Sequence, residues 1–211
     1  MTAIVDYGAG NIASIRNMLR RLGHPAVITA EPEEVARAER LILPGVGAFD
    51  YGMSRLEETG LAQALGQRVQ GEGRPLLGIC LGAQLLSRRS EEGRRTGLGY
   101  IPAETVAFVR ERLAPGLRVP HMGWAGVRAE GESRLLAGLP EEARFYFVHS
   151  YHLRMDGPVE ARLTADHGYS FPAGVEQENL AAVQFHPEKS RRFGMQLLDN
   201  FVRRFAPRGG R

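Results

Sequence analysis

Hydrophobic positions along the chain fall into two patterns. Some form short unbroken runs, which are typical of strands buried on both faces of a sheet. Others recur every three or four residues, as on the inward face of an amphipathic helix. The unbroken runs predict strands at residues 3–5, 26–28, 41–43, 75–79 and 180–185. The helical spacing predicts helices at residues 12–22, 33–38, 50–59, 61–70, 82–89 and, after Ser190, as far as Phe205.

Strands and helices alternate along most of the chain, which predicts an α/β fold with a mostly parallel central sheet and helices on both faces. Between about Gly93 and Asp166 the segments shorten, so an additional antiparallel, strand-rich section is expected there. Within it, residues 105–109 and 145–152 are expected strands, and 120–124 an expected loop. The length suits one domain, predicted over residues 1–206, with a flexible tail at 207–211.

The candidate nucleophile is Cys80, the only cysteine of the chain. It lies between a predicted strand and a predicted helix, with Gly78 two residues before it and Gly82 two residues after. This spacing is typical of the sharp strand-to-helix turn that presents a catalytic side chain at the end of a strand. The N–H groups that begin the helix would stabilise negative charge on the sulfur. The alternative is a small buried core residue.

A candidate base and carboxylate follow the last predicted strand. His186 and Glu188 flank Pro187, which holds His186 extended. Residues two apart in an extended segment point the same way, so the imidazole and the carboxylate are expected side by side. With Cys80 they would form a triad: the thiolate attacks a carbonyl carbon, the imidazole transfers protons and the carboxylate orients the ring. The predicted reaction is acyl transfer to water through a thioester.

The loop at residues 44–47 follows the third predicted strand, at the sheet edge where ligands bind in open parallel sheets. Glycines on both sides of Val46 let backbone N–H groups approach a ligand closely. The amides of Val46 and Leu81 are therefore the expected oxyanion hole. A plain tight turn fits the same four residues.

The composition of the chain excludes several classes of protein. Hydrophobic residues make up 43% and charged residues 24% of the chain, as in ordinary globular proteins. No apolar stretch is long enough for a membrane span, no signal peptide is recognisable and one cysteine allows no internal disulfide. A cytoplasmic location without a membrane partner is therefore expected. Basic residues gather in residues 189–211, but no nucleic-acid motif accompanies them, so no nucleic-acid partner is expected.

Two further features leave alternatives open. His149 and His152 are spaced like a pair of metal ligands, but no suitably spaced third ligand follows, so neither a metal nor a cofactor is predicted. Trp124, the only tryptophan, is either a core residue or, with Met122, an exposed protein-binding site.

The segments around the proposed triad resemble the triad glutamine amidotransferases. This resemblance is carried by residues 78–84 and 186–188. Other segments resemble the glutaminase subunit of imidazole glycerol phosphate synthase, and they span nearly the whole chain: residues 6–11, 44–47, 97–99, 121–124, 148–151 and 184–190.

The resemblance implies a function. The family hydrolyses glutamine to glutamate and ammonia and passes the ammonia to a separate (β/α)8-barrel cyclase, with which it forms a heterodimer in histidine biosynthesis. Glutaminase activity is expected to be weak until the cyclase is bound. The residues expected around the glutamine are Gly47, Gln84, His149, Ser150 and Tyr151. Those expected toward the cyclase are Asn11, Met122, Trp124, Tyr146 and Lys189.

One departure from the family and two alternative functions remain. The family usually has Asn after its Met-Gly-Trp segment, and Ala125 lacks that amide. The same triad could serve another synthase, such as the anthranilate or pyridoxal phosphate enzymes, although the opening segment at residues 6–11 favours the histidine-pathway subunit. A catalytically dead regulatory module would keep the fold only to bind a partner, and the intact triad disfavours it.

Overall fold

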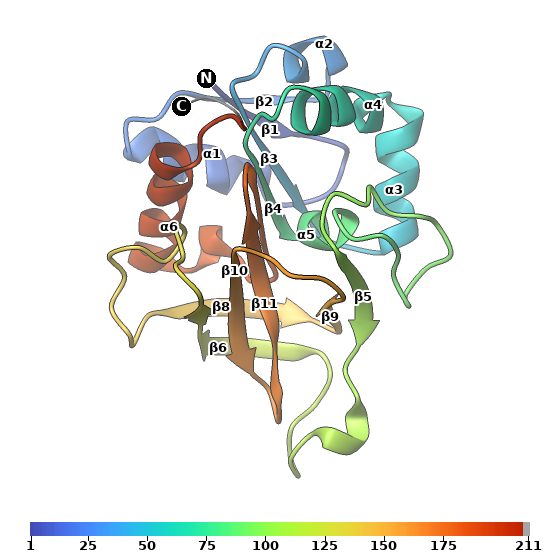
Figure 1. The fold of residues 1–211 in the computed structure, drawn as a ribbon, viewed down its shortest axis with the longest axis vertical. Helices are drawn as coiled ribbons and strands as arrows, with labels where there is room; N and C mark the ends of the chain where they lie inside the picture. Colours follow the sequence, from blue (N-terminus) through green and yellow to red (C-terminus); the bar gives the residue numbers. More distant parts are fainter. Residues whose placement is uncertain (209–211) are drawn as a thin grey trace.

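The centre of the computed structural model, which describes residues 1–208, is an eight-stranded sheet (Figure 1). Its strand order is β2-β1-β3-β4-β12-β11-β10-β7. The strands from β2 to β12 run parallel, and the remaining three continue the sheet antiparallel. The bounds are β1 Thr2–Val5, β2 Ala26–Thr29, β3 Arg40–Gly45, β4 Leu76–Cys80, β7 Arg128–Glu130, β10 Ala161–Asp166, β11 Ser170–Gln177 and β12 Leu180–Val183. The predicted mostly parallel sheet is confirmed.

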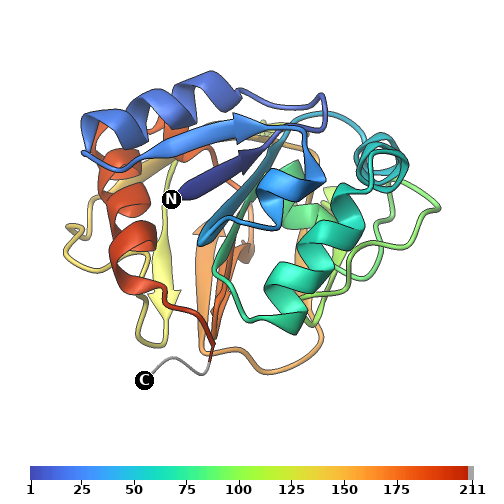
Figure 2. The ribbon, with the colours of Figure 1, turned by 90° about the horizontal axis from the view of Figure 1, so that it is seen from above.

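Helices cover both faces of this sheet (Figure 2). Two helices, α1 (Ile12–Arg21) and α6 (Arg191–Arg204), pack on one face. The other face carries α2 Pro32–Val35, α3 Phe49–Glu58, α4 Leu61–Leu65 and α5 Leu81–Leu85. Side chains of β1 point alternately to the two faces of the sheet, and each face has its own hydrophobic cluster. Ala3 and Val5 belong to the cluster under α3 to α5, and Ile4 belongs to the cluster under α1 and α6.

The middle of the chain forms two small antiparallel sheets, as the strand-rich pattern predicts. In one, β5 (Ala103–Ala107) pairs with β9 (Tyr151–Met155). In the other, β6 (His121–Gly126) pairs with β8 (Arg144–His149), lying across the lower half of the view in Figure 1. A short 3-10 turn, Arg110–Arg112, lies in the loop that connects β5 to β6.

Several predicted boundaries are wrong. The expected loop at 120–124 is largely strand β6. The expected strand at 145–152 is two strands, because β8 pairs with β6 whereas β9 pairs with β5, and the chain changes sheets at Ser150. The expected helix at 61–70 is α-helical only to Leu65 and continues as a π-helix over Gly66–Gly71.

The helix expected at 82–89 ends at Leu85, because the chain beyond it pairs with β5. The Arg88 N–H donates to the Ala103 carbonyl at 3.0 Å, and the Thr105 N–H donates to the Arg89 carbonyl at 2.9 Å. The Ser87 hydroxyl donates to the Gln84 carbonyl at 2.7 Å. Backbone groups that a longer helix would use are thus satisfied by a neighbouring strand.

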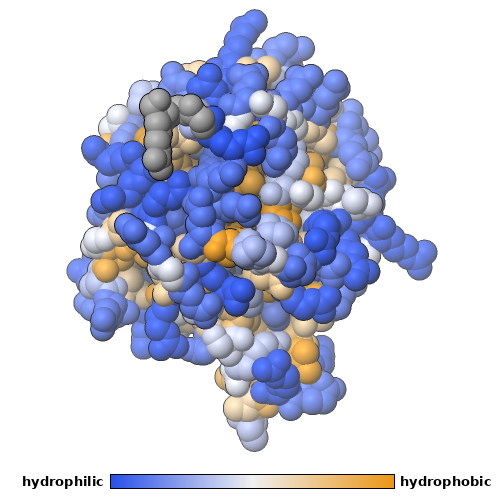
Figure 3. Space-filling model, in the orientation of Figure 1, coloured by the Kyte–Doolittle hydropathy of each residue, from blue (hydrophilic) through white to orange (hydrophobic). Residues whose placement is uncertain are grey.

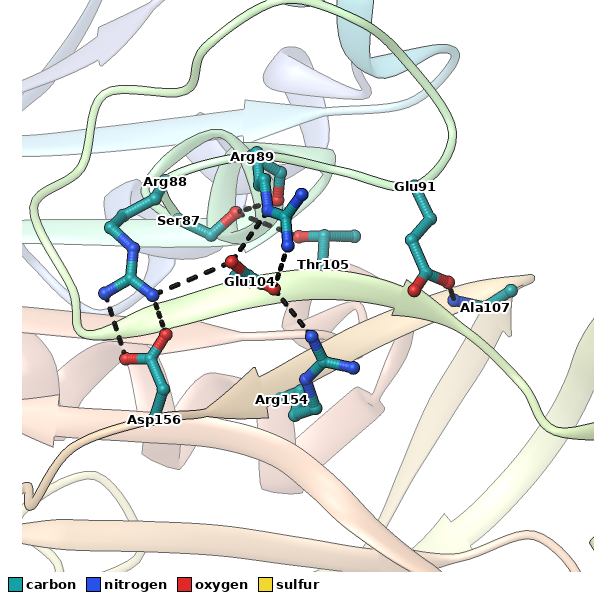
Figure 4. Close-up of polar contacts among 9 residues, drawn as sticks. All are labelled: Ser87, Arg88, Arg89, Glu91, Glu104, Thr105, Ala107, Arg154 and Asp156. Carbon is teal, nitrogen blue, oxygen red and sulfur yellow. Dashed lines mark hydrogen bonds and ion pairs between the residues drawn. The ribbon is translucent and has the colours of Figure 1, made fainter.

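Ion pairs hold the segment after α5 against β5 and β9 (Figure 4). The Glu104 carboxylate accepts hydrogen bonds from Arg89 at 2.7 Å and from Arg154 at 2.6 Å, while Arg88 pairs with Asp156. The bond from Arg89 contributes most to lowering the pKa of Glu104, which falls to about 2. The segment that follows Cys80 and α5 is therefore tied to both strands of the β5–β9 sheet.

Within the predicted tail, the Arg208 N–H donates to the Gly73 carbonyl at 2.8 Å, and its guanidinium donates to Glu178 at 3.2 Å. The rest of that tail, residues 209–211, lies outside the described part of the chain. Across residues 1–208, no helix has both the length and the apolar character needed to cross a membrane. The face drawn in Figure 3 is mostly hydrophilic, with small separate hydrophobic patches.

Candidate active site

Cys80 occupies the turn between β4 and α5 in a conformation that side chains rarely adopt, with φ 54° and ψ −112°. The flanking glycines explain why the turn closes. A Cβ at Gly78 would lie 2.8 Å from the Ala83 backbone, and a Cβ at Gly82 would collide with the carbonyl oxygen of Leu43. The predicted nucleophile elbow is thus formed, and it directs the sulfur to the wall of a cavity.

The predicted base and carboxylate lie in contact. His186 Nδ1 is 2.7 Å from Glu188 Oε1, and both side chains are buried. His186 is extended (φ −103°, ψ 96°), as expected for a residue before proline. Its backbone is bonded to β8 and to the residue before α6. Its N–H donates to the Tyr146 carbonyl at 2.9 Å, and the Ser190 hydroxyl donates to the His186 carbonyl at 2.6 Å.

Burial and two neighbouring groups set the pKa of His186, which is raised to about 9. Burial is the largest influence and lowers the pKa, but Cys80 and Glu188 together outweigh it. Among the described residues, Nε2 is buried and has no hydrogen-bond partner, whereas Nδ1 is bonded to Glu188. The structure therefore brings Cys80, His186 and Glu188 together, in an arrangement that favours the protonated imidazole.

A cavity of about 380 Å³ opens beside the sulfur. The residues that line it include both candidates for the oxyanion hole and every residue expected around the glutamine. Its walls are Val46, Gly47, Cys80, Leu81, Gln84, Glu92, Pro120, Val148, His149, Ser150 and Tyr151. The parallel pairing of β3 and β4 reaches Gly45 and Cys80, so Val46 and Leu81 follow two neighbouring strand ends. The volume is within the range of small-molecule sites.

Gln84 presents its oxygen to this cavity. Its Nε2 donates to the Tyr151 carbonyl at 3.2 Å and to Gln184 Oε1 at 3.0 Å, which uses both amide hydrogens. The remaining group, Oε1, is an acceptor suited to an ammonium or amide donor of a ligand.

The two histidines considered as metal ligands are hydrogen-bonded on every ring nitrogen. His149 contacts the Tyr151 carbonyl at 2.8 Å and His121 at 3.1 Å. His152 contacts the Leu153 carbonyl at 2.8 Å and the Tyr169 hydroxyl at 3.2 Å. Within residues 1–208, no group of three metal-binding side chains is arranged around a common point.

Two residues of this site are absent from the sequence-based expectations. Glu92 lines the cavity, and its Oε2 accepts a hydrogen bond from the Phe49 N–H at 2.8 Å. Only the long-range fold places it there, so no local pattern indicates it. Gln184 donates to the Cys80 sulfur at 3.7 Å. Its position two residues before His186 was a usable signal, because alternate residues of an extended segment share a side.

Four of the five residues expected toward a partner form one exposed surface. Met122 and Trp124 are 63% and 44% exposed on β6. The Trp124 ring lies 5.9 Å from the Tyr146 ring, over which the Lys189 ammonium lies at 5.5 Å. Asn11 is exposed at the start of α1, without the side-chain cap that its position suggested.

Ala125 lies on the opposite face of β6 from Met122 and Trp124. It is half-buried and packs against the core cluster under α1 and α6. A carboxamide at this position would therefore point toward the core cluster and away from the exposed surface. The missing amide does not alter the exposed face itself.

A profile of the class-I glutamine amidotransferases matches residues 3–205. The chain belongs to this family. An imidazole glycerol phosphate synthase subunit HisH 2 of Methanococcus maripaludis is 47% identical over 203 residues, covering 96% of this chain and 99% of that protein. The protein of the same name from Pseudomonas aeruginosa is 47% identical over 202 residues, covering 96% and 98%. These likenesses confirm the resemblance noted in the sequence.

The fold is that of the glutamine amidotransferases as well. A crystal structure described as a glutamine amidotransferase superposes with a TM-score of 0.72, covering 95% of this chain and 98% of the other. At 23% sequence identity, that likeness concerns the fold alone.

Proposed function

We propose that this chain is the glutaminase subunit of an imidazole glycerol phosphate synthase and supplies ammonia for histidine biosynthesis. The observation that carries the proposal is the buried His186–Glu188 pair beside Cys80 at the wall of a cavity that a small amino acid could fill. Family membership and the names of the relatives from two organisms support the substrate and the pathway. A cytoplasmic location belongs to the same proposal.

Hydrolysis proceeds in two acyl-transfer steps. The Cys80 thiolate attacks the side-chain carboxamide carbon of glutamine, and the imidazolium of His186 gives its proton to the departing nitrogen, so that ammonia leaves and a thioester forms. Water then attacks the thioester while His186 accepts its proton, which releases glutamate and restores the thiolate. Glu188 holds the ring by Nδ1 and stabilises its charged form, at 2.7 Å.

The cavity offers complementary groups for the substrate. Gln84 Oε1 and the Glu92 carboxylate are acceptors suited to the α-ammonium group of glutamine. Ser150 and Tyr151 also line the cavity, and their backbone N–H groups are assigned to the α-carboxylate. His149 contributes only the surface of its ring to the cavity wall, because both of its ring nitrogens are already hydrogen-bonded.

The negative oxygen that develops in each step is assigned to the backbone amides of Val46 and Leu81. Both residues line the cavity with Cys80, and Gly47 follows with a φ of 115°, a conformation that suits glycine. Loss of one such donor typically costs about 3 kcal/mol of transition-state stabilisation. A change in the orientation of the 44–47 loop would therefore alter the rate strongly.

The partner in this proposal is a separate (β/α)8-barrel cyclase that receives the ammonia. The surface of Met122, Trp124, Tyr146 and Lys189 is assigned to it, with Asn11 at the start of α1. Exposed aromatic and methionine side chains are typical of protein interfaces. A sealed contact would keep ammonia from bulk water, where protonation ends its nucleophilicity.

The decisive experiment is glutamate release by the purified chain, with and without the cyclase and the nucleotide ligand of the cyclase. We expect a large stimulation by the loaded cyclase, its loss in Cys80→Ala, and a weaker stimulation in Trp124→Ala with an otherwise folded protein. Full activity of the isolated chain, indifferent to the cyclase, would contradict the subunit assignment. Failure of a glutamine-analogue electrophile to label Cys80 would instead favour an inactive regulatory module.

A further inference from the structure

A chain of buried amides leads from the cavity wall to the sulfur of Cys80. Gln84 donates one amide hydrogen to the Tyr151 carbonyl and the other to Gln184 Oε1. Gln184 in turn directs its Nε2 at the Cys80 sulfur, 3.7 Å away. Gln184 is fully buried, and it is not among the residues that line the cavity.

The direction of every bond in this chain follows from its first member. The Tyr151 carbonyl can only accept, so the group of Gln84 that faces it must be the NH2 group. The same NH2 group faces Gln184, which must therefore present its oxygen to Gln84. The NH2 group of Gln184 is then left on the side of the sulfur. An amide flip would oppose two donors at Gln84, so the donor toward Cys80 is fixed by the network.

The backbone holds Gln184 in the same place. It follows β12, which pairs with β4 through Val183 and Ile79, so Gln184 is the next residue beside Cys80. Its own N–H donates to the Ala173 carbonyl of β11 at 2.8 Å. The side chain therefore emerges from the middle of the main sheet, next to the nucleophile and with little freedom to move.

We infer that Gln184 is a positioning residue, which holds the Cys80 sulfur and stabilises its negative charge by donating an N–H, while Gln84 keeps that donor oriented. An N–H bond to an anionic sulfur is stronger than one to a neutral thiol, so the donor favours the reactive form. Because Gln84 also belongs to the cavity wall, occupation of the cavity and orientation of the donor involve the same side chain. The inference rests on Cys80 as the nucleophile of the proposed function.

Alkylation of Cys80 tests this inference without using the glutaminase reaction. The chain has one cysteine, so the mass added by iodoacetamide reports on that sulfur alone. The rate of alkylation against pH gives the midpoint at which the sulfur becomes reactive. That midpoint belongs to the coupled Cys80–His186 pair, with Glu188 and the neutral phenol of Tyr7 as the other titratable neighbours, and the variants leave all of these in place.

Four variants separate positioning from a structural role. Gln184→Met keeps the volume and removes the donor, and we expect the midpoint to rise by about one pH unit. Gln184→Glu adds a negative charge at the same place and should raise it further. Gln84→Met frees the amide of Gln184 to flip and should raise it less. The matched control is Asn179→Leu, because Asn179 is an equally buried amide that binds only the carbonyls of Val69 and Arg74.

Steady-state kinetics of the full chain with its cyclase give the second readout. We expect Gln184→Met to lower kcat about tenfold with KM within about threefold, since Gln184 does not touch the cavity.

An unchanged alkylation midpoint in the folded Gln184 variants would overturn the inference, whatever their activity. If those variants fail to fold, an unchanged midpoint in Gln84→Met overturns it equally. A shifted midpoint in a chain that does not hydrolyse glutamine would sustain the inference and contradict only the proposed function.

Discussion

Three buried histidines make the stability of this protein depend on pH. His121, His149 and His152 pack with Phe108 and Phe171 near the base of the cavity. The hydrogen bonds of His149 fit a neutral ring only. Nδ1 of His149 donates to a carbonyl, so Nε2 must accept from His121, and a proton on it would place two donors 3.1 Å apart.

Burial is the main cause that lowers the pKa of each of these rings. The pKa of His121 falls from 6.5 to about 4, and those of His149 and His152 are lowered as well. A histidine that stays neutral in the folded state is protonated only on unfolding, so stability is full above pH 6.5 and declines as the pH falls below it. His186 acts in the opposite sense, because its pKa is raised and its contribution is full below 6.5.

The size of this change in the free energy of unfolding can be worked out for two of the four rings. Between about pH 7.5 and about pH 5.5, His121 removes about 1.4 kcal/mol of stability, because its ring stays neutral in the folded state. Over the same interval His186 adds about 1.3 kcal/mol, which offsets the loss at His121. The net loss of stability on acidification therefore comes from His149 and His152, whose pKa values are also lowered by burial.

Urea unfolding followed by circular dichroism at these two pH values measures the loss. In His121→Gln one of the neutral rings is gone, so the loss between the two pH values should shrink by about 1.4 kcal/mol, whatever the absolute stability of the variant. A core variant that keeps every histidine, Leu56→Ala, should show the wild-type loss. An equal loss in wild type and His121→Gln would refute this account of the cluster.

Other substitutions test the packing around the site. The Tyr7 hydroxyl is buried against Gly45 without a partner among the described residues, so Tyr7→Phe should raise the free energy of unfolding by about 1 kcal/mol, and a lower urea midpoint would contradict this. Gly82→Ala should destabilise the fold by more than about 3 kcal/mol, whereas Gly126→Ala, where a Cβ meets open space, should change the urea midpoint little. Glu104→Gln should lower the melting temperature at low salt but hardly at high salt, and an equal effect in both would show that charge is not its role.

Features that depend on neighbouring residues were predictable from the sequence. The glycines around Cys80 gave the elbow, because a turn of this kind needs positions without a Cβ. Pro187 and the two-residue spacing gave the His186–Glu188 contact. The short apolar runs gave the parallel strands, since burial on both faces leaves no room for polar alternation.

Features that depend on distant partners were not predictable. The helix after Cys80 is short because Arg88 and Arg89 pair with a strand that comes later in the chain. The aromatic run after Arg144 divides at Ser150 because its halves find different partners. Glu92 lines the cavity from a loop, where its carboxylate accepts a hydrogen bond from the distant Phe49 N–H. In each case backbone groups satisfied elsewhere overrode a local preference.

The backbone conformation of Cys80 presents the sulfur to the cavity at a cost in the stability of the fold. A residue at φ 54° and ψ −112° bears a Cβ where a glycine would be relaxed, and such geometry costs about 1–3 kcal/mol. Cys80→Gly should therefore give an inert protein with a higher melting temperature than the active one, and a fall in that temperature would contradict the strain. A cysteine at this turn therefore lowers thermal stability, and the reaction assigned to its sulfur in the proposed function accounts for its presence.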